Sequence, residues 1–224
     1  MNAPVRRIVP IFISLFSITS AFAVGAFDPT QFSTGDFHGC PPTGQGSDPY
    51  LNSLKNRDKR PTTARLYTVN SLYQATPALP NRRAARSKWT AAQRALAAKW
   101  ESIPVMVEGY LIHIPVREGK EACNCSSQQY VDHHMWLGPT PTSARTKAMV
   151  VEISPRAWAT HPSWINAMAY LKPVVDNREK VRVTGWLTYD QEHHEQVGKT
   201  RRTLYEVHPI HAIQVLRGDK WVTL

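Results

Sequence analysis

Acidic and imidazole side chains recur along the second half of this 224-residue chain, at strand ends and in loops that a compact fold would bring together. Such groups can perform general acid–base catalysis, hold a hydroxide-generating metal ion or position a phosphate. The residues are Asp132, His134, Asp190, His193, His194, Glu206 and His208, with Arg201 and Arg202 in the same loop region. The alternative is a hydrogen-bonded network that fixes the loop after Tyr189, and nine histidines make a chance association easy. We favour the network and predict no catalytic residue, metal ligand or cofactor.

The three cysteines are Cys40, Cys123 and Cys125. In an exported chain the default state of cysteine is a disulfide, so we predict that Cys40 pairs with Cys123 or with Cys125. A bridge of that span would tie the turn-rich early part of the chain to the later part. The rival is a metal site using two thiolates with His133 or His134, but Cys-x-Cys is not the usual zinc spacing.

The elements that must position these groups are five strands, with a helical segment between the third and the fourth. The predicted strands are 104–116, 130–137, 148–153, 180–189 and 203–215. The helical segment is predicted to begin at Ser154, to be interrupted at Pro162 and to resume at Ser163. Glycines at Gly109 and Gly185 predict points of sharp coiling, Pro209 predicts a bend or an edge position, and Pro173 predicts a helix end. The order predicts a mainly β fold, a five-stranded Greek-key barrel of the OB-fold type.

A loop-rich extension precedes the barrel. Residues 40–49 are turn-forming throughout, and Thr90 with Gln93 forms a capping-box pattern that predicts a helix over about 90–101, packed on the barrel. We divide the chain into a signal peptide (1–23), a basic extension (24–103) and the barrel (104–224).

Alternation along the strands predicts which side chains face outward. Trp136 shares a face with His134, and Trp186 shares a face with Arg182, so each tryptophan lies on a polar side. The tryptophans could stack on a ligand, or the extension could cover them as a second small core. The predicted ligand-binding residues are Trp136, Trp186, His134, Arg182, His193, Arg201 and His208.

The first residues predict export. Arg6 and Arg7 precede an apolar run of about 15 residues, shorter than the roughly 20 that span a bilayer, and Ala21-Phe22-Ala23 is a cleavage signal. We therefore expect a periplasmic or secreted protein, cut near Ala23 and not inserted in a membrane.

The charge is uneven along the chain. The whole sequence has a formal net charge of +10, but residues 24–100 carry 11 Lys/Arg against 4 Asp/Glu, whereas residues 101–224 carry 14 against 13. A basic protein suggests a nucleic-acid partner. Here most of the excess lies in the extension, which equally fits a solvated basic linker.

Several short motifs resemble a group of uncharacterised exported bacterial proteins with an OB-fold. They are 39–42 (GCPP), 51–57 (LNSLKNR), 107–111 (VEGYL), 123–125 (CNC), 132–137 (DHHMWL), 150–156 (VVEISPR), 183–187 (VTGWL), 190–193 (DQEH) and 206–210 (EVHPI). The resemblance implies a fold and, by analogy, nucleic-acid binding, with no assigned catalysis.

Two functions follow from these patterns. The first is a monomeric, non-enzymatic OB-fold binding module for an oligonucleotide, a glycan or an envelope protein. The second is a metal-dependent hydrolase or nuclease that uses the Asp/His/Glu cluster at one end of the barrel. A hydrolase needs those side chains convergent in an open cleft, and a binding module needs exposed aromatic side chains. The sequence contains no glycine-rich phosphate loop, Gly-x-Ser-x-Gly, His-Glu-x-x-His or Walker motif.

Overall fold

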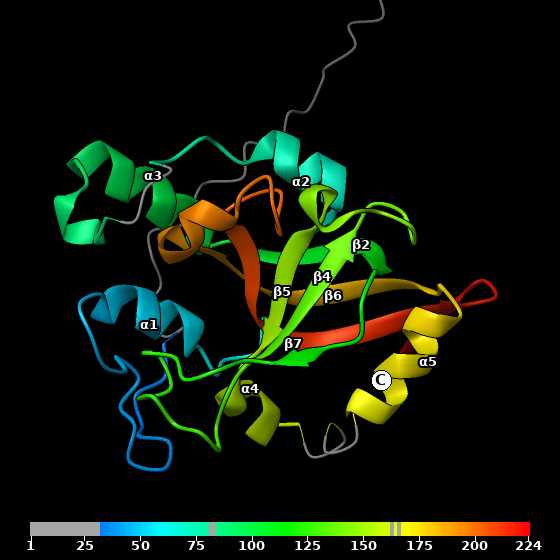
Figure 1. Ribbon diagram of the computed structural model, residues 1–224, viewed down its shortest axis with the longest axis horizontal. Coiled ribbons are helices and arrows are strands. Elements are labelled where there is room, and N and C mark those ends of the chain that lie inside the picture. Colours follow the sequence, from blue (N-terminus) through cyan, green and yellow to red (C-terminus); the bar gives the residue numbers. More distant parts are fainter. Residues whose placement is uncertain (1–31, 81–83, 162–163, 165–166) are drawn as a thin grey trace, which may run out of the picture.

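The computed structural model describes residues 32–80, 84–161, 164 and 167–224 (Figure 1). The predicted signal peptide and its cleavage site therefore lie outside the described residues. Within the described part, no helix is both long enough and apolar enough to cross a membrane.

Five strands close into a barrel in the order β2-β6-β7-β5-β4, with β4 returning to pair with β2. The β5–β7 pair is parallel and the other four pairs are antiparallel. The strands are β2 (Pro104–Leu111), β4 (His133–Gly138), β5 (Met149–Ile153), β6 (Lys180–Tyr189) and β7 (Tyr205–Arg217). This arrangement confirms the predicted five-stranded barrel of the OB-fold type.

Both predicted coil points lie where two strands approach closely. A Cβ on Gly109 would lie 2.7 Å from the carbonyl oxygen of Gly138, beside the pairing that closes the barrel. A Cβ on Gly185 would lie 2.2 Å from the carbonyl oxygen of Pro209, where the β6–β7 register shifts. Only glycine fits such contacts without displacing backbone. Pro209 lies at this bulge in β7, which pairs with strands on both sides. The sequence predicted a bend here, and a bulge can accommodate proline because it tolerates a missing N–H.

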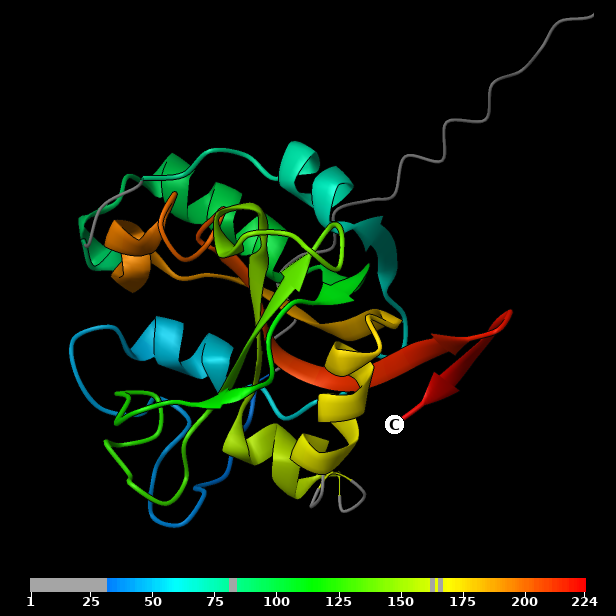
Figure 2. The ribbon, with the colours of Figure 1, turned by 45° about the vertical axis from the view of Figure 1, so that its right-hand side comes forward.

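Among the described residues, the connection from β5 to β6 includes α4 (Pro155–Ala159) and α5 (Ala167–Asp176). The predicted interruption at Pro162 lies outside the described residues. Ser154 caps α4 by accepting a hydrogen bond from the Ala157 N–H. Pro173 lies inside α5 and does not end it, so the predicted helix end was wrong. Leu171 and Val174 are buried on either side of this proline, and packing holds the last turn in place. Figure 2 shows α5 beside the barrel.

The extension packs around the barrel and adds a strand to it. Strand β1 pairs in parallel with β2, and α3 packs on β6. The predicted capping box at Thr90 is present. The elements of the extension are α1 (Pro49–Lys55), β1 (Arg65–Thr68), α2 (Val69–Ala75), the 3-10 turn η2 (Arg86–Lys88) and α3 (Ala91–Glu101).

The remaining elements are short. They are β3 (Val116–Arg117), the 3-10 segments η3 (Arg145–Lys147) and η5 (Gln191–Gln196), and β8 (Lys220–Thr223). Strand β8 forms a hairpin with the end of β7 that extends to the right in Figure 1.

The hydrophobic core fills the barrel interior and consists of the inward-facing side chains of each strand. Met135 and Leu137 of β4, Val151 of β5 and Val207 of β7 are fully buried in one apolar cluster. Their neighbours in sequence point outward, which places the polar set of β4, β5 and β7 on one outer surface.

Candidate functional site

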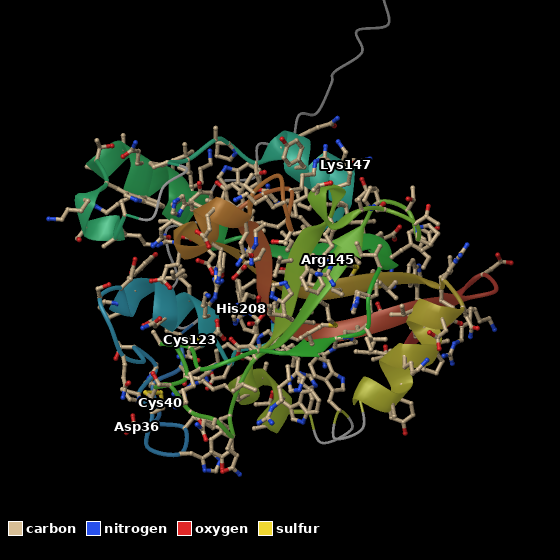
Figure 3. The ribbon with its side chains drawn as sticks, in the orientation of Figure 1. Asp36, Cys40, Cys123, Arg145, Lys147 and His208 are labelled. Atoms are coloured by element: carbon tan, nitrogen blue, oxygen red, sulfur yellow. A yellow bond between two sulfur atoms is a disulfide. The ribbon has the colours of Figure 1, made fainter. Side chains whose placement is uncertain are left out.

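The polar side chains on the outer surface of β4, β5 and β7 form a buried cluster. We call it the ionic cluster, and define it as Glu118, Glu121, Asp132, His134, Glu152, Glu206 and His208, with Lys55, Asp190 and Arg201 at its edge. Strand alternation places His134, Glu152, Glu206 and His208 outward. They are covered because α1 and the loops 118–132 and 190–204 lie over this face. Figure 3 shows His208 near the middle of the molecule, between Cys123 and Arg145.

His208 lies at the centre of the cluster, and its side chain is completely buried. Its Nδ1 lies 2.9 Å from Glu152 and 3.2 Å from Glu206, and its Nε2 lies 3.3 Å from Asp132. Burial alone would lower the pKa of His208, but the carboxylates of Glu152 and Asp132 raise it well above its ordinary value.

His134 forms the outer part of the cluster. Its Nδ1 lies 2.6 Å from Glu118 and 2.8 Å from Glu152. Burial opposes the charge on this imidazole, but the attraction of Glu152 and the hydrogen bonds to both carboxylates raise the pKa of His134 to about 9. Glu118 is one-third exposed, so this part of the cluster is the part nearest to solvent.

At its other edge, the ionic cluster connects the extension to the loop that follows β6. The Lys55 ammonium at the end of α1 lies 2.7 Å from Asp190. Asp190 also lies 2.8 Å from the Nδ1 of His193 and accepts a hydrogen bond from the Glu192 N–H at 2.9 Å. Arg201 pairs with Glu206 at 3.1 Å. Burial would raise the pKa of Asp190, but Lys55 holds it well below its usual value.

The disulfide joins Cys40 to Cys125, which confirms the predicted bridge between the extension and the barrel and selects one of its two pairings. Cys123 is free and buried beside the cluster, with its Sγ 3.7 Å from Asp132. Burial, reinforced by the carboxylates of Asp132 and Glu121, raises the pKa of the Cys123 thiol well above its usual value.

Three sets of side chains bring possible metal-ligand atoms within 4.8 Å of one another. The sets are Glu118/His134/Glu152, Glu121/Cys123/Asp132 and Asp132/Glu152/His208. Nitrogen and oxygen donors dominate, and this donor set suits zinc or another first-row transition metal better than calcium.

Both tryptophans are largely buried. Trp186 is 5% exposed; its Nε1–H donates to the Lys59 carbonyl, and the Arg57 guanidinium lies 5.0 Å from its ring. The extension therefore covers Trp186, which is the second of the two alternatives that the sequence left open. Trp136 is 8% exposed and is covered differently: the Arg145 guanidinium stacks 4.0 Å from its ring.

Trp136 lies between two loops that contact each other. Its Nε1–H donates to the Thr200 carbonyl at 2.7 Å, and the Arg202 N–H donates to the Ala148 carbonyl at 2.8 Å. Segments 138–148 and 197–205 contain no Asp or Glu. We call their outward cations the basic rim, and define it as Arg145, Lys147, Lys199 and Arg202. Figure 3 shows Arg145 and Lys147 above the cluster.

The predicted site residues divide into three groups. His134, His193, Arg201 and His208 meet in or beside the ionic cluster. Trp136 and Trp186 are each packed under an arginine. Arg182 lies with Gln214 and Trp221 of the β7–β8 hairpin, apart from the cluster.

The sequence-based site omitted Lys55, Glu118, Glu121 and Glu152. Glu152 had a usable signal, because a carboxylate in the otherwise apolar run Met149–Ile153 must face away from the barrel interior. Lys55, Glu118 and Glu121 gave none, because charged residues in loops and at helix ends are common.

The fold and the disulfide define this protein as an OB-type barrel with a covalently attached extension. Comparison with models of known protein families and with curated proteins gives no match.

Proposed function

We propose that this protein is an exported, non-enzymatic binding protein, and that its ligand is a single-stranded nucleic acid that contacts the basic rim and Trp136. The observation that carries the proposal is the Arg145–Trp136 stack, bordered by Lys147, Lys199 and Arg202 on two loops without carboxylates. OB barrels bind oligonucleotides over the second and third barrel strands and the loops next to them, and these strands are β4 and β5 here.

The chemistry of the rim suits a phosphate backbone with bases beside it. Four cations in one region can each contact a phosphate. Trp136 offers a π-face to a base once the Arg145 side chain swings away, and a half-buried arginine on an exposed loop can do this without unfolding. Arg202 is held against the ring of Tyr73, 3.8 Å from its centre, so this cation is positioned in advance.

The hydrolase alternative has one observation in its favour, the convergence of Asp132, Glu152 and His208. Against it stands their burial: Asp132 and His208 are 0% exposed and Glu152 is 3% exposed. Burial leaves these atoms without the open cleft that a substrate phosphate needs. Burial of the convergent groups favours binding over hydrolysis.

Export is supported by the disulfide, because such bonds persist in oxidising compartments outside the cytoplasm. The signal peptide and the position of the cut near Ala23 remain part of the proposal.

Fluorescence anisotropy with a labelled 15-nucleotide oligo(dT) at low salt tests the binding proposal. Arg145→Glu and Lys147→Glu should each weaken binding at least about tenfold, because each replaces a phosphate contact by repulsion. The matched control is Lys220→Glu on the exposed β7–β8 hairpin, which should bind as the unaltered protein does. No binding by the unaltered protein, or an equal loss in all three variants, would contradict the proposal. Unchanged binding by the Arg145 and Lys147 variants would contradict binding at the basic rim.

A further inference from the structure

We propose that the cavity between α1, η2 and α3 binds a small organic monocarboxylate with an apolar body. The cavity has a volume of about 540 Å³ and is partly open to solvent. Figures 1 and 2 show α1 and α3 on the same side of the barrel. None of the described residues that line the cavity belongs to the ionic cluster or the basic rim. The lining includes Asp48, Tyr50, Arg86, Arg94, Ala95 and Ala98.

The size and the walls of the cavity are the first argument. Sites for small organic molecules are typically about 300–1,000 Å³ and mostly apolar, with a few well-placed polar groups. Tyr50 of α1 contributes an aromatic wall. Ala95 and Ala98 lie three residues apart on one face of α3 and form a second, apolar wall. Because these side chains are small, they leave room beside Tyr50 for an apolar body.

The carboxylate of Asp48 is already occupied, which argues against a cationic ligand. Its Oδ1 accepts a hydrogen bond from the Leu51 N–H at 3.0 Å. Its Oδ2 accepts from the Gln191 side chain at 2.7 Å and from the Arg86 N–H at 3.3 Å. Asp48 is the only acidic residue among the described residues that line the cavity, so a ligand cation would find no free carboxylate there.

Arg94 brings a cation without an acidic partner to the cavity. The Arg86 guanidinium, by contrast, donates to both oxygens of Glu101, at 2.8 and 2.5 Å, and to the Tyr189 carbonyl at 2.6 Å. Arg94 donates to the Trp89 carbonyl, which is neutral, and no acidic side chain in the described part of the chain pairs with it. The charge of Arg94 is therefore available to an anion that enters the cavity.

A carboxylate is the anion that matches this single charge. A guanidinium binds a carboxylate through two parallel N–H···O bonds, which fix its orientation as well as its position. A phosphate monoester carries a charge of about −1.5 to −2 at pH 7, and its second charge would lie without a cation beside apolar walls.

The experiment uses the full mature chain and three ligands with the same ring system: 2-naphthoate, its neutral amide and 2-naphthyl phosphate. Calorimetric titration should find one naphthoate site per chain. The amide should bind at least about tenfold more weakly, because it lacks the charge-assisted hydrogen bonds to Arg94. Absence of naphthoate binding, equal binding of the amide, or tighter binding of the phosphate would overturn the proposal.

Matched variants locate the site. Arg94→Gln should weaken naphthoate binding at least about tenfold, whereas Lys99→Gln, which removes an exposed cation of α3 outside the cavity, should leave it unchanged. Ala95→Leu keeps the test decisive if Arg94→Gln fails to fold. It fills the cavity with a good helix former and should also weaken binding at least about tenfold, unlike Ala92→Leu on the exposed surface of the same helix.

A last variant separates this cavity from the basic rim. Arg145→Glu should bind naphthoate as the unaltered protein does. A loss of naphthoate binding in this variant would place the anion on the basic rim and overturn the proposal. Unchanged binding by the Arg94 and Ala95 variants, or equal losses in a variant and its control, would overturn it as well.

Discussion

One fully buried arginine, Arg57, contributes hydrogen bonds to the contact between the extension and the barrel. Arg57 donates from its Nη1 to the Glu101 carbonyl at 2.7 Å and from its Nη2 to the Leu187 carbonyl at 3.0 Å. It also donates to the Thr188 hydroxyl and to the Leu54 carbonyl, both at 2.9 Å. We expect Arg57→Met to remove these bonds while keeping most of the side-chain volume.

The expected loss is the difference between two opposing effects. Three carbonyl acceptors lose a charged donor, at roughly 1–2 kcal/mol each, about 3–6 kcal/mol in total. Against this, the variant no longer buries a guanidinium. Burial, only partly offset by Glu101, lowers the pKa of Arg57 to about 9, so the cost of burying its charge is large. Removing the buried charge returns roughly 1–2 kcal/mol, so we expect a net loss of about 3 kcal/mol in the free energy of unfolding.

The assay is urea unfolding at pH 7.5, followed by far-ultraviolet circular dichroism and by tryptophan fluorescence. The Arg57 guanidinium lies beside Trp186, so the fluorescence signal reports on this contact directly. The control is Arg60→Met, three residues further on and exposed, which should lose less than about 0.5 kcal/mol. Equal losses in the two variants would refute the reasoning, because the extension would then not be anchored through Arg57.

Three further perturbations have defined outcomes. Cys40→Ser should lower the free energy of unfolding by about 2–4 kcal/mol, because the disulfide to Cys125 closes a loop of 85 residues. Urea unfolding of the oxidised protein measures this loss, and an unchanged midpoint would count against it. Burial, aided by neighbouring cations, lowers the pKa of His211 to about 3, so its contribution to stability is fully present above the unfolded pKa of about 6.5 and is lost as pH falls toward the folded value. His211→Leu should therefore remove about 3 kcal/mol of the decline in stability between pH 7 and pH 4, and an unchanged slope would contradict this. Trp186→Ala should mainly destabilise the protein, whereas Trp136→Ala should also weaken oligonucleotide binding at least about fivefold under conditions where the variant is folded; equal binding per folded molecule in both variants would exclude Trp136 as a contact.

The fold could be predicted because its signals are local and repeated. The alternation of apolar and polar residues predicted the inward face of β6. Gly109 and Gly185 indicated the two places where neighbouring strands approach each other closely. The end of α5 was predicted wrongly, because burial of Val174 outweighs the local effect of Pro173. Strand β8 was missed because a four-residue run at the end of a chain carries too little pattern.

The site was predicted in part, and the reason is long-range contact. The sequence named Asp132, His134, Glu206 and His208, which meet in the cluster. It omitted Glu118, Glu121 and Glu152, and it included His194, which pairs with Glu195 outside the cluster. That Lys55 from α1 would reach Asp190, more than a hundred residues later, depends on how the extension packs. The same packing brings the Lys59 carbonyl to the Trp186 Nε1–H, and no sequence pattern in either segment predicts this contact.

The dependence of oligonucleotide affinity on salt tests the proposed function most directly. If the four cations of the basic rim each contact a phosphate of a single strand, the logarithm of the association constant should fall against the logarithm of salt with a slope of about −3. The double variant Arg145→Ala/Lys147→Ala should reduce this slope by about 1.4, whereas Lys220→Ala should leave it unchanged. A flat salt response, or a slope that the double variant does not alter, would contradict binding of a phosphate backbone at this face.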